Sequence, residues 1–131
     1  MKLIEEILRE DNLQEAIRRV KANRGVAGVD KMTVAQIDTY FEEHKEEIIE
    51  SIMNKKYKPQ LVKRVYIPKS NGKLRPLGIP VVVDRVIQQA IAQKLIPIYE
   101  DIFSDNSYGF RPNRDCHLAI DSVLIHLNNG Y

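Results

Sequence analysis

The sequence has a single cysteine, and no hydrophobic run in it approaches the roughly 18 residues that a membrane-spanning helix requires. One cysteine, Cys116, cannot form an internal disulfide, which favours a reducing compartment. Acidic residues in the N-terminal MKLIEEILRED stand where a secretory signal would have an apolar centre. We therefore expect a cytoplasmic protein with no membrane partner, and we interpret Cys116 as ordinary packing rather than a nucleophile.

The sequence also lacks the short motifs of common active sites. There is no nucleophile elbow, no phosphate-binding glycine loop and no zinc signature. His44, His117 and His126 are not at metal-ligand spacing, and a structural zinc ion requires four ligands. Most acidic residues fall on one predicted helix face or near helix starts, where solvation and capping are their usual roles. The residues alone therefore predict no metal site and no catalytic site.

Acidic residues are missing from one long internal stretch. Between Glu50 and Asp84 there is no Asp or Glu, but there are eight basic residues: Lys55, Lys56, Lys58, Lys63, Arg64, Lys69, Lys73 and Arg75. The whole chain of 131 residues has a net charge of only +2, so its positive charge is strongly segregated. A local positive field attracts phosphate even when net charge is small. Basic residues also protect strand edges from aggregation, but eight without an acid favour a nucleic-acid surface.

The basic stretch has the pattern of a β-hairpin. Residues 61–67 are rich in β-branched and aromatic side chains, and residues 74–79 can pair with them. Asn71-Gly72 lies between them, and both residues of this dipeptide tolerate the positive φ of a tight turn. The strands are expected to be short or edge-like, because they contain or adjoin prolines that lack amide donors: Pro68, Pro76 and Pro80. We predict a two-stranded basic ribbon at about residues 61–80, projecting from a helical body.

Apolar residues at helical spacing predict several helices before the ribbon. Asp11 or Asn12 is expected to cap the second of two N-terminal helices. Thr33, with Gln36 as its capping-box partner, is expected to begin the next helix. A further helix is expected after His44-Lys45.

Two more helices are expected after the ribbon. Asp84 is expected to cap a long helix at about 84–103, which Pro97 should kink or end. The last helix is expected at about 115–128, with Gly130 as its C-terminal cap. The expected fold class is α+β: mainly helical, with one projecting antiparallel β-hairpin.

Two clusters of side chains, one in the ribbon and one in loop 108–112, are candidate binding sites. Lys69 precedes the ribbon turn, and Lys73 and Arg75 follow it, so a phosphate could be held from both strands. Loop 108–112 places two aromatic residues beside Arg111. Aromatic rings can stack on bases while an arginine holds phosphate, but the same rings could instead plug the core. On the residues alone, both interpretations of this loop stay open.

Four motifs, in the same order, resemble the reverse transcriptases encoded by group II introns, also called intron maturases. They are loop 23–30 (NRGVAGVD), ribbon segment 67–80 (IPKSNGKLRPLGIP), helix start 84–90 (DRVIQQA) and loop 108–112 (YGFRP). The resemblance runs from about Leu13 to Tyr131. It implies a polymerase shaped like a right hand. In such a polymerase, residues 1–30 would form an N-terminal extension with a lid loop, and residues 31–131 would form the fingers.

The resemblance also implies roles for individual residues. Lys69 and Arg75 match the pair that holds the triphosphate of the incoming deoxynucleotide (dNTP). The resemblance, together with the charge of the basic ribbon, implies that a further set of residues contacts the template or other RNA. These residues are Arg24, Gly25, Lys63, Arg64, Lys73, Ile79, Pro80, Arg85, Gln88, Arg111 and Asn113. Arg18 and Arg19 in the N-terminal helices are either intron-RNA contacts or simply solvated side chains.

Catalysis in this family depends on two Mg²⁺ ions held by palm aspartates, and the matching motifs are not in this sequence. The chain is therefore expected to be a fingers fragment without a palm, which binds no cofactor itself and cannot polymerise alone. The implied partners of the full-length protein are group II intron RNA, an RNA template with a DNA primer, and dNTP. The implied setting is the bacterial cytoplasm.

Two alternatives stay open. The parent protein could be a non-catalytic RNA-binding module that serves only splicing, although an intact Lys69 and Arg75 pair argues against this. The ribbon could instead be a structural element that pairs with its own copy. Because a fragment without its palm exposes apolar surface, a homodimer of the fragment is also expected.

Overall fold

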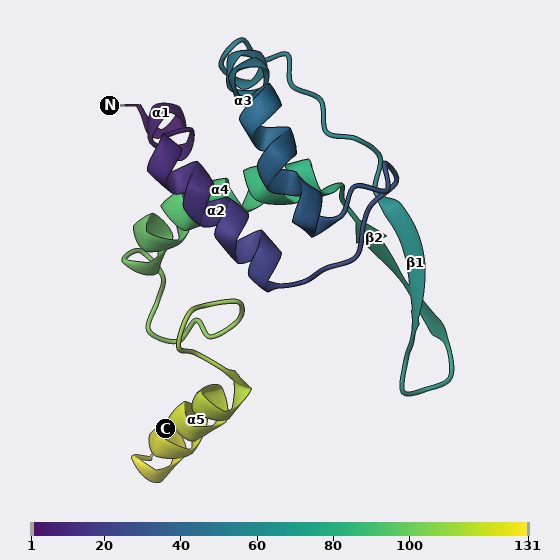
Figure 1. The fold of residues 1–131 in the computed structure, drawn as a ribbon. Coiled ribbons are helices and arrows are strands. Elements are labelled where there is room, and N and C mark those ends of the chain that lie inside the picture. The colour runs from purple at the N-terminus through teal and green to yellow at the C-terminus, as the bar shows by residue number, and fades with distance from the viewer. Residues whose placement is uncertain (1, 131) are drawn as a thin grey trace. The chain divides into compact units, whose positions relative to one another are not determined.

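A computed structural model describes residues 2–130, which form helices and one two-stranded antiparallel sheet (Figure 1). The elements are α1 (Leu3–Ile7), α2 (Glu10–Ala22), the 3₁₀ turn η1 (Val34–Gln36), α3 (Ile37–Met53), β1 (Lys63–Pro68), β2 (Leu74–Ile79), α4 (Val82–Glu100) and α5 (Cys116–Asn128). The predicted α+β class, mainly helical with one hairpin, is confirmed. Met1 and Tyr131, the outer limits of the predicted regions, lie outside the described residues. None of the helices between residues 2 and 130 is both long and apolar enough to cross a membrane.

The chain divides into two compact units, one up to Lys94 and one from Leu95 onward, and α4 continues across this division. The first unit holds the hydrophobic core. Buried residues of α2 recur at helical spacing and pack in one cluster with buried residues of α3 and α4. The cluster includes Leu13, Ala16, Ile17, Val20, Ile37, Phe41, Ile48, Val82, Val86 and Ala90. Burial of each large apolar side chain contributes about 1.5–3 kcal/mol, so this cluster fixes the helices that carry the ribbon.

The expected cap of α2 by Asp11 or Asn12 is wrong. The helix begins at Glu10, with Arg9 as the residue that precedes it, and Asn12 lies buried inside the first turn. Its Nδ2 donates to the carbonyl oxygens of Ile7 (2.7 Å) and Ala90 (3.1 Å). Its side-chain oxygen accepts from Gln93 Nε2 at 2.9 Å. Asn12 therefore joins α2 to α4 through buried hydrogen bonds instead of capping its own helix.

The region expected to hold two helices around His44 forms the single helix α3. It follows η1, where the Thr33 N–H donates to Gln36 Oε1 at 3.0 Å, as half of the predicted capping box. The expected break at His44-Lys45 does not occur. No glycine or proline interrupts α3, and the Tyr40 ring stacks on His44 one turn later, with centroids 4.2 Å apart. The helix therefore runs through to Met53.

Of the two helices after the ribbon, α4 departs from expectation at its start and at Pro97. This helix begins at Val82, so Asp84 lies in its first turn rather than at its cap, and it continues through Pro97 to Glu100. Of the two effects expected of Pro97, a kink or an end to the helix, the end is therefore excluded. In contrast, Asp115 caps α5, since its Oδ1 accepts from the Leu118 N–H at 2.8 Å. Gly130 follows α5 with a φ of 89°, as expected for a C-terminal glycine.

The ribbon turn differs in detail from the predicted tight turn. The Gly72 N–H donates to the Lys69 carbonyl at 3.1 Å, and the Lys69 N–H donates to the Lys73 carbonyl at 2.7 Å. Gly72 has a φ of 81°, whereas Asn71 is not among the residues with positive φ. This is a longer hairpin loop with one left-handed glycine. Asn71 contributes through its side chain, which accepts from the Lys73 N–H at 3.1 Å.

Candidate nucleic-acid interface

The strand register sorts the ribbon side chains onto two faces. Ile67 pairs with Arg75, and Lys63 pairs with Ile79. The hydrogen bond from Lys69 to Lys73 continues the same register into the loop. Directly paired residues, and residues two apart on one strand, share a face of the sheet. Lys63, Lys69, Lys73 and Arg75 therefore lie on one face, which we call the cationic face.

These four cations are available to a ligand. All four side chains are exposed, and no ion pair among residues 2–130 joins any of them to a carboxylate. Lys69 and Arg75 thus meet both requirements of a phosphate clamp, because they share a face and are not neutralised by the described part of the chain. An arginine fork and a lysine ammonium together suit a phosphate group with several oxygens.

The cations of the N-terminal helices, in contrast, are paired with carboxylates. Glu15 accepts hydrogen bonds from Arg18 (2.6 and 2.8 Å) and from Arg19 (2.9 Å). These bonds, that of Arg18 first, lower the pKa of Glu15 to about 2. Lys21 pairs with Asp38 on α3. These basic groups therefore already have anionic partners, whereas the four cations of the cationic face have none among residues 2–130.

Loop 23–30 is held against the junction between β2 and α4. Arg85 Nε donates to the Pro80 carbonyl at 3.0 Å, and its Nη2 donates to the Val26 carbonyl. A Cβ added to Gly28 would lie 2.8 Å from Val81 Cα and 3.0 Å from the Pro80 oxygen, so only glycine fits there. Arg85 is therefore a tie between this loop and the end of the ribbon, and its expected contact with a template would need part of this bonding to be released.

Gly25, Arg85 and Gln88, three of the expected template contacts, line one cavity of about 310 Å³. Asn23 and Gln89 also line it, so three side-chain amides face the same space. Amides both donate and accept hydrogen bonds, which suits the polar edges of nucleotides. Ile79 and Pro80 lie half-buried just before this region, and Arg24 is exposed in the loop with a φ of 48°.

The chain entering the ribbon is fixed by a residue whose role the sequence did not indicate. Asp84, only 4% exposed, accepts from the Tyr57 hydroxyl and, at 2.9 Å, from the Gln60 N–H. Burial, and then the bond to Asp84, raise the pKa of Tyr57. Both partners precede β1, whereas Asp84 follows β2. The adjacent Asp84 and Arg85 therefore fix the two ends of the ribbon. The one sequence signal for the role of Asp84 is its position as the first acidic residue after the acid-free stretch.

Comparisons with known proteins identify the family to which the chain is related. The family model for reverse transcriptase (RNA-dependent DNA polymerase) matches residues 67–129. Protein YkfC of Escherichia coli (strain K12) is 38% identical over 130 residues, covering 98% of this chain and 34% of that protein. The group II intron-encoded protein LtrA of Lactococcus lactis subsp. cremoris is 41% identical over 118 residues, covering 89% of this chain and 20% of LtrA.

The chain belongs to the group II intron-encoded reverse transcriptase family. Nuclear intron maturase 1, mitochondrial, of Arabidopsis thaliana is also similar, at 37% identity over 57 residues, covering 41% of this chain and 8% of that protein. The chain therefore spans only about a third or a smaller share of the length of these relatives, at 34%, 20% and 8%.

In this chain, the loop after α4 is organised around Arg111. Its guanidinium forms a two-point ion pair with Glu100 (2.7 and 3.2 Å) and donates to the carbonyls of Ser104 (2.8 Å) and Ser107 (2.6 Å). The residue is only 8% exposed. The hydrogen bond to Glu100 raises the pKa of Arg111. Arg111 thus orders the loop from within, and it has little capacity left for the template contact that the resemblance implies.

The aromatic residues of this loop do not plug the core of their unit. Phe110 is fully exposed, with a φ of 54°, and Tyr108 is half-buried beneath the Arg114 guanidinium, which lies 5.0 Å from the ring centroid. Asn113 is exposed, with a φ of 59°. The core interpretation of Phe110 is therefore wrong, and the loop presents an aromatic ring and an amide outward.

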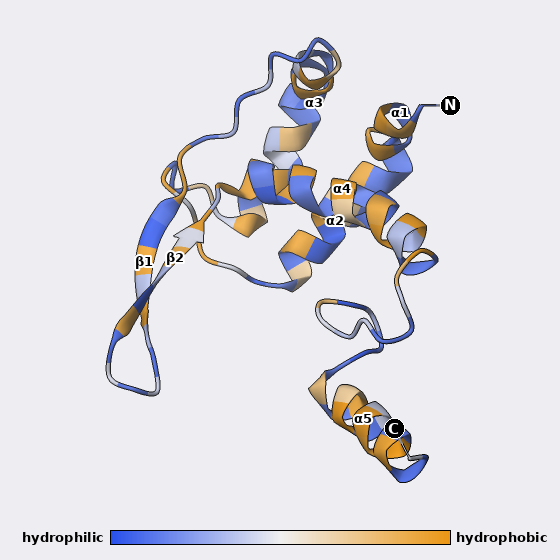
Figure 2. Ribbon diagram, turned by 180° about the vertical axis from the view of Figure 1, so that it is seen from behind, coloured by the Kyte–Doolittle hydropathy of each residue, from blue (hydrophilic) through white to orange (hydrophobic). Residues whose placement is uncertain are grey.

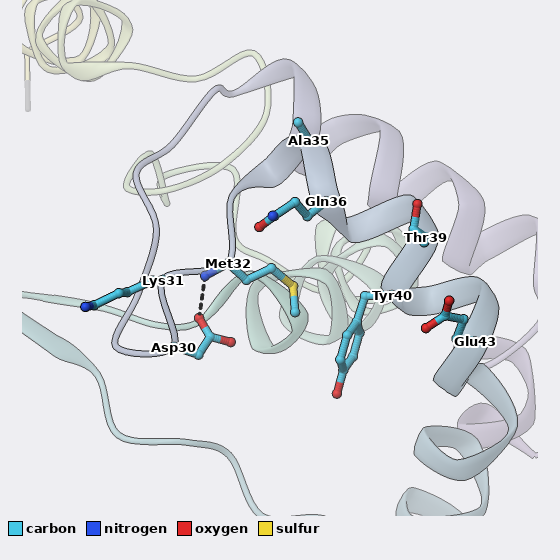
Figure 3. A pocket seen from close by; sticks show the side chains of 8 residues that line it. All are labelled: Asp30, Lys31, Met32, Ala35, Gln36, Thr39, Tyr40 and Glu43. Carbon is cyan, nitrogen blue, oxygen red and sulfur yellow. Dashed lines mark hydrogen bonds between the residues drawn. The ribbon is translucent and has the colours of Figure 1, made fainter.

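A hollow of about 670 Å³ beside η1 and α3 is a poor site for nucleic acid (Figure 3). Asp30 and Glu43 line it on either side of Met32 and Tyr40, so carboxylates would repel a phosphate. Asp30 also accepts from the Met32 N–H at 3.1 Å, which closes the turn that leads into η1. Within residues 2–130, no group of three or more His, Cys, Asp or Glu could hold a metal ion.

Proposed function

We propose that this chain is the fingers region, residues 31–131, and N-terminal extension, residues 1–30, of a group II intron reverse transcriptase, and that its ribbon grips the triphosphate of the incoming dNTP. The observation that carries the proposal is the placement of Lys69 and Arg75. They share the cationic face, are exposed, and pair with no carboxylate of the described chain. A dNTP triphosphate offers several negative oxygens, which Arg can hold bidentately and Lys can neutralise.

The template strand is proposed to pass along the loop 23–30 and the first turns of α4. The amide-lined cavity at Gly25 and Gln88 supports this path, as does the exposed Arg24 beside it. Lys63, Arg64 and Lys73 extend positive charge along the ribbon. Arg85 serves here mainly as the tie that holds the loop, and Arg111 as the group that presents Phe110 and Asn113.

The proposed parent enzyme is an RNA-directed DNA polymerase. In such enzymes Mg²⁺ activates the primer end and stabilises the leaving pyrophosphate. The residues described here do not fit such a site, because no cluster of metal ligands occurs among them. We therefore expect the isolated chain to fail to extend a primer. The proposed partners of the full protein are group II intron RNA and an RNA template with a DNA primer, in the bacterial cytoplasm.

The proposal is tested by separating dNTP use from RNA binding in a polymerase that contains this region. Lys69→Ala combined with Arg75→Ala should raise the KM for dNTP roughly 10-fold or more, since a hydrogen bond to a charged group is worth about 1.5–3 kcal/mol. Intron RNA affinity should fall far less. Arg18→Ala combined with Arg19→Ala is the matched control, and it should leave the dNTP KM unchanged. Equal losses of dNTP use and RNA binding would contradict the clamp.

The same assay distinguishes a polymerase from the alternative function, RNA binding that serves only splicing. A splicing-only RNA-binding module would bind intron RNA but show no dNTP-dependent extension, and its RNA affinity would be the property most sensitive to Lys69 and Arg75.

A further inference from the structure

The ribbon has a second face, opposite the cationic face, that the proposed triphosphate clamp does not use. The register pairs Tyr66 with Pro76 and Pro68 with Leu74, and it puts Arg64 on the same side. We call this side, made of Arg64, Tyr66, Pro68, Leu74 and Pro76, the tyrosine face. All five residues are exposed, with Tyr66 at 57% and Leu74 at 60%.

We propose that the tyrosine face is a stacking surface for unpaired bases of an RNA strand. The inference rests on the proposed nucleic-acid role of the ribbon and adds a second contact surface to it. An exposed aromatic ring stacks on any base, because every base has a π-face, and a neighbouring arginine can hold the phosphate of the stacked nucleotide. Arg64 is two residues from Tyr66 on the same face, and it pairs with no carboxylate of residues 2–130.

The hydrogen-bond pattern of the two strands determines which side chain lies beside the Tyr66 ring. Because Lys69 and Lys73 form a bonded pair, alternation makes Ile67–Arg75 bonded and Tyr66–Pro76 non-bonded. Side chains of non-bonded pairs lie closest together, so we expect the Pro76 ring to lie beside Tyr66.

Charge favours RNA over a protein as the occupant. No acidic residue lies between Glu50 and Asp84, so both faces of the ribbon sit in a positive field. The alternation also turns the nitrogen atoms of Pro68 and Pro76 toward the two outer edges of the ribbon. Because proline has no N–H, these positions cannot donate to an added strand, and pairing of the ribbon edge with a protein strand is disfavoured.

Two substitutions at Tyr66 separate stacking from simple apolar contact. Tyr66→Phe keeps the ring, whereas Tyr66→Leu keeps apolar bulk but removes the π-face. The probe is a single-stranded oligoribonucleotide that carries one 2-aminopurine, whose fluorescence falls when the base stacks. The chain of 131 residues should quench it, and the Phe variant should bind within about 2-fold of the unchanged chain. The Leu variant should bind roughly 5-fold or more weakly and lose the quenching, in line with measured base–aromatic stacking.

A second set of measurements keeps the inference apart from the triphosphate clamp. Arg64→Gln should weaken oligoribonucleotide binding and flatten its salt dependence, without changing dNTP binding. Lys69→Ala with Arg75→Ala should weaken dNTP binding and preserve the quenching of 2-aminopurine. The clamp can therefore fail while the stacking result stands.

Three outcomes would overturn the inference. One is equal RNA binding by the Phe and Leu variants, which would indicate apolar contact without stacking. Another is RNA binding and quenching unchanged by both Tyr66→Leu and Arg64→Gln. The third is a tyrosine face that governs self-association instead, seen as a change in sedimentation with Tyr66→Leu and no change in RNA binding.

Discussion

At the scale of single residues, ion pairing separates the cations of the helices from those of the ribbon. Arg18 and Arg19 share one carboxylate, that of Glu15, whereas Lys69 and Arg75 have none within residues 2–130. A paired cation must give up its partner before it can bind phosphate, and an unpaired one need not. Phosphate affinity is therefore expected to reside in the ribbon, although sequence composition alone treats both groups alike.

The shared carboxylate of Glu15 gives a prediction about pH. Hydrogen bonds from Arg18 and then Arg19 lower the pKa of Glu15 to about 2. Because the folded pKa lies below the unfolded one, the stabilisation by these pairs is complete above the ordinary glutamate pKa of about 4.3 and is lost as pH falls toward 2. NMR titration of the Glu15 carboxyl carbon measures this. The double variant Arg18→Gln, Arg19→Gln should return the pKa to its ordinary range, and an unchanged low value would contradict the assignment.

A second residue-scale prediction concerns the bond between Tyr57 and the buried Asp84. Tyr57→Phe removes the hydroxyl donor and leaves Asp84 with only the Gln60 N–H. The expected loss is about 1.5–3 kcal/mol of unfolding free energy, as for hydrogen bonds to charged groups. Urea unfolding followed by circular dichroism measures it. Tyr99→Phe, at an exposed tyrosine, is the control, and matching midpoints for the two variants would refute the role of this bond.

At the scale of elements, loop 23–30 depends on its close approach to the junction of β2 and α4. Gly28→Ala would put a Cβ 2.8 Å from Val81 Cα and force the backbones apart. Such overpacking costs roughly 1–3 kcal/mol, so amides of residues 24–28 should exchange with solvent faster. Gly109→Ala is the matched control, because its Cβ would meet nothing within 4 Å. Slow exchange retained in the Gly28 variant would show that the loop is held by Arg85 alone.

Elements with local causes were predictable from sequence, and those with distant causes were not. The ribbon and the Asp115 cap follow from neighbouring residues, as turn chemistry and capping do. Asn12 looked like a cap, but its partner Ala90 is 78 residues away. The polar dipeptide His44-Lys45 is typical of a break between helices, but α3 continues through it to Met53. Among the site residues, the exposure of Lys69 and Arg75 and their lack of an ion-pair partner within residues 2–130 are visible only in the folded structure.

At the scale of the whole chain, the two units differ in how much apolar surface they bury. The core cluster lies in the unit up to Lys94, whereas α5 has no buried residue. Figure 2 shows hydrophobic residues along much of α5, and its exposed apolar side chains are Leu118, Ile120, Val123, Leu124, Ile125 and Leu127. A helix of 13 residues is only marginally stable in water on its own.

We therefore predict that the stability of α5 and the association of the chain both depend on protein concentration. In dilute solution its amides should exchange quickly, while those of α2 stay protected by the core. At higher concentration the chain should associate through α5, because exposed apolar surface favours contact with a second copy. Sedimentation velocity over a dilution series measures this, and Leu124→Glu should shift the chain toward monomer. A strict monomer with α5 amides as protected as those of α2 would contradict the prediction.

The central claim, that Lys69 and Arg75 grip phosphate, is tested most directly by NMR of their side-chain nitrogens. A deoxynucleoside triphosphate should shift the Lys69 Nζ and Arg75 Nε signals in a saturable and salt-sensitive way, whereas the unphosphorylated nucleoside should not. The Arg18 and Arg19 signals, already paired with Glu15, should move little. If the ribbon signals stay fixed, or if Arg18 and Arg19 shift just as much, the triphosphate is not held by this clamp.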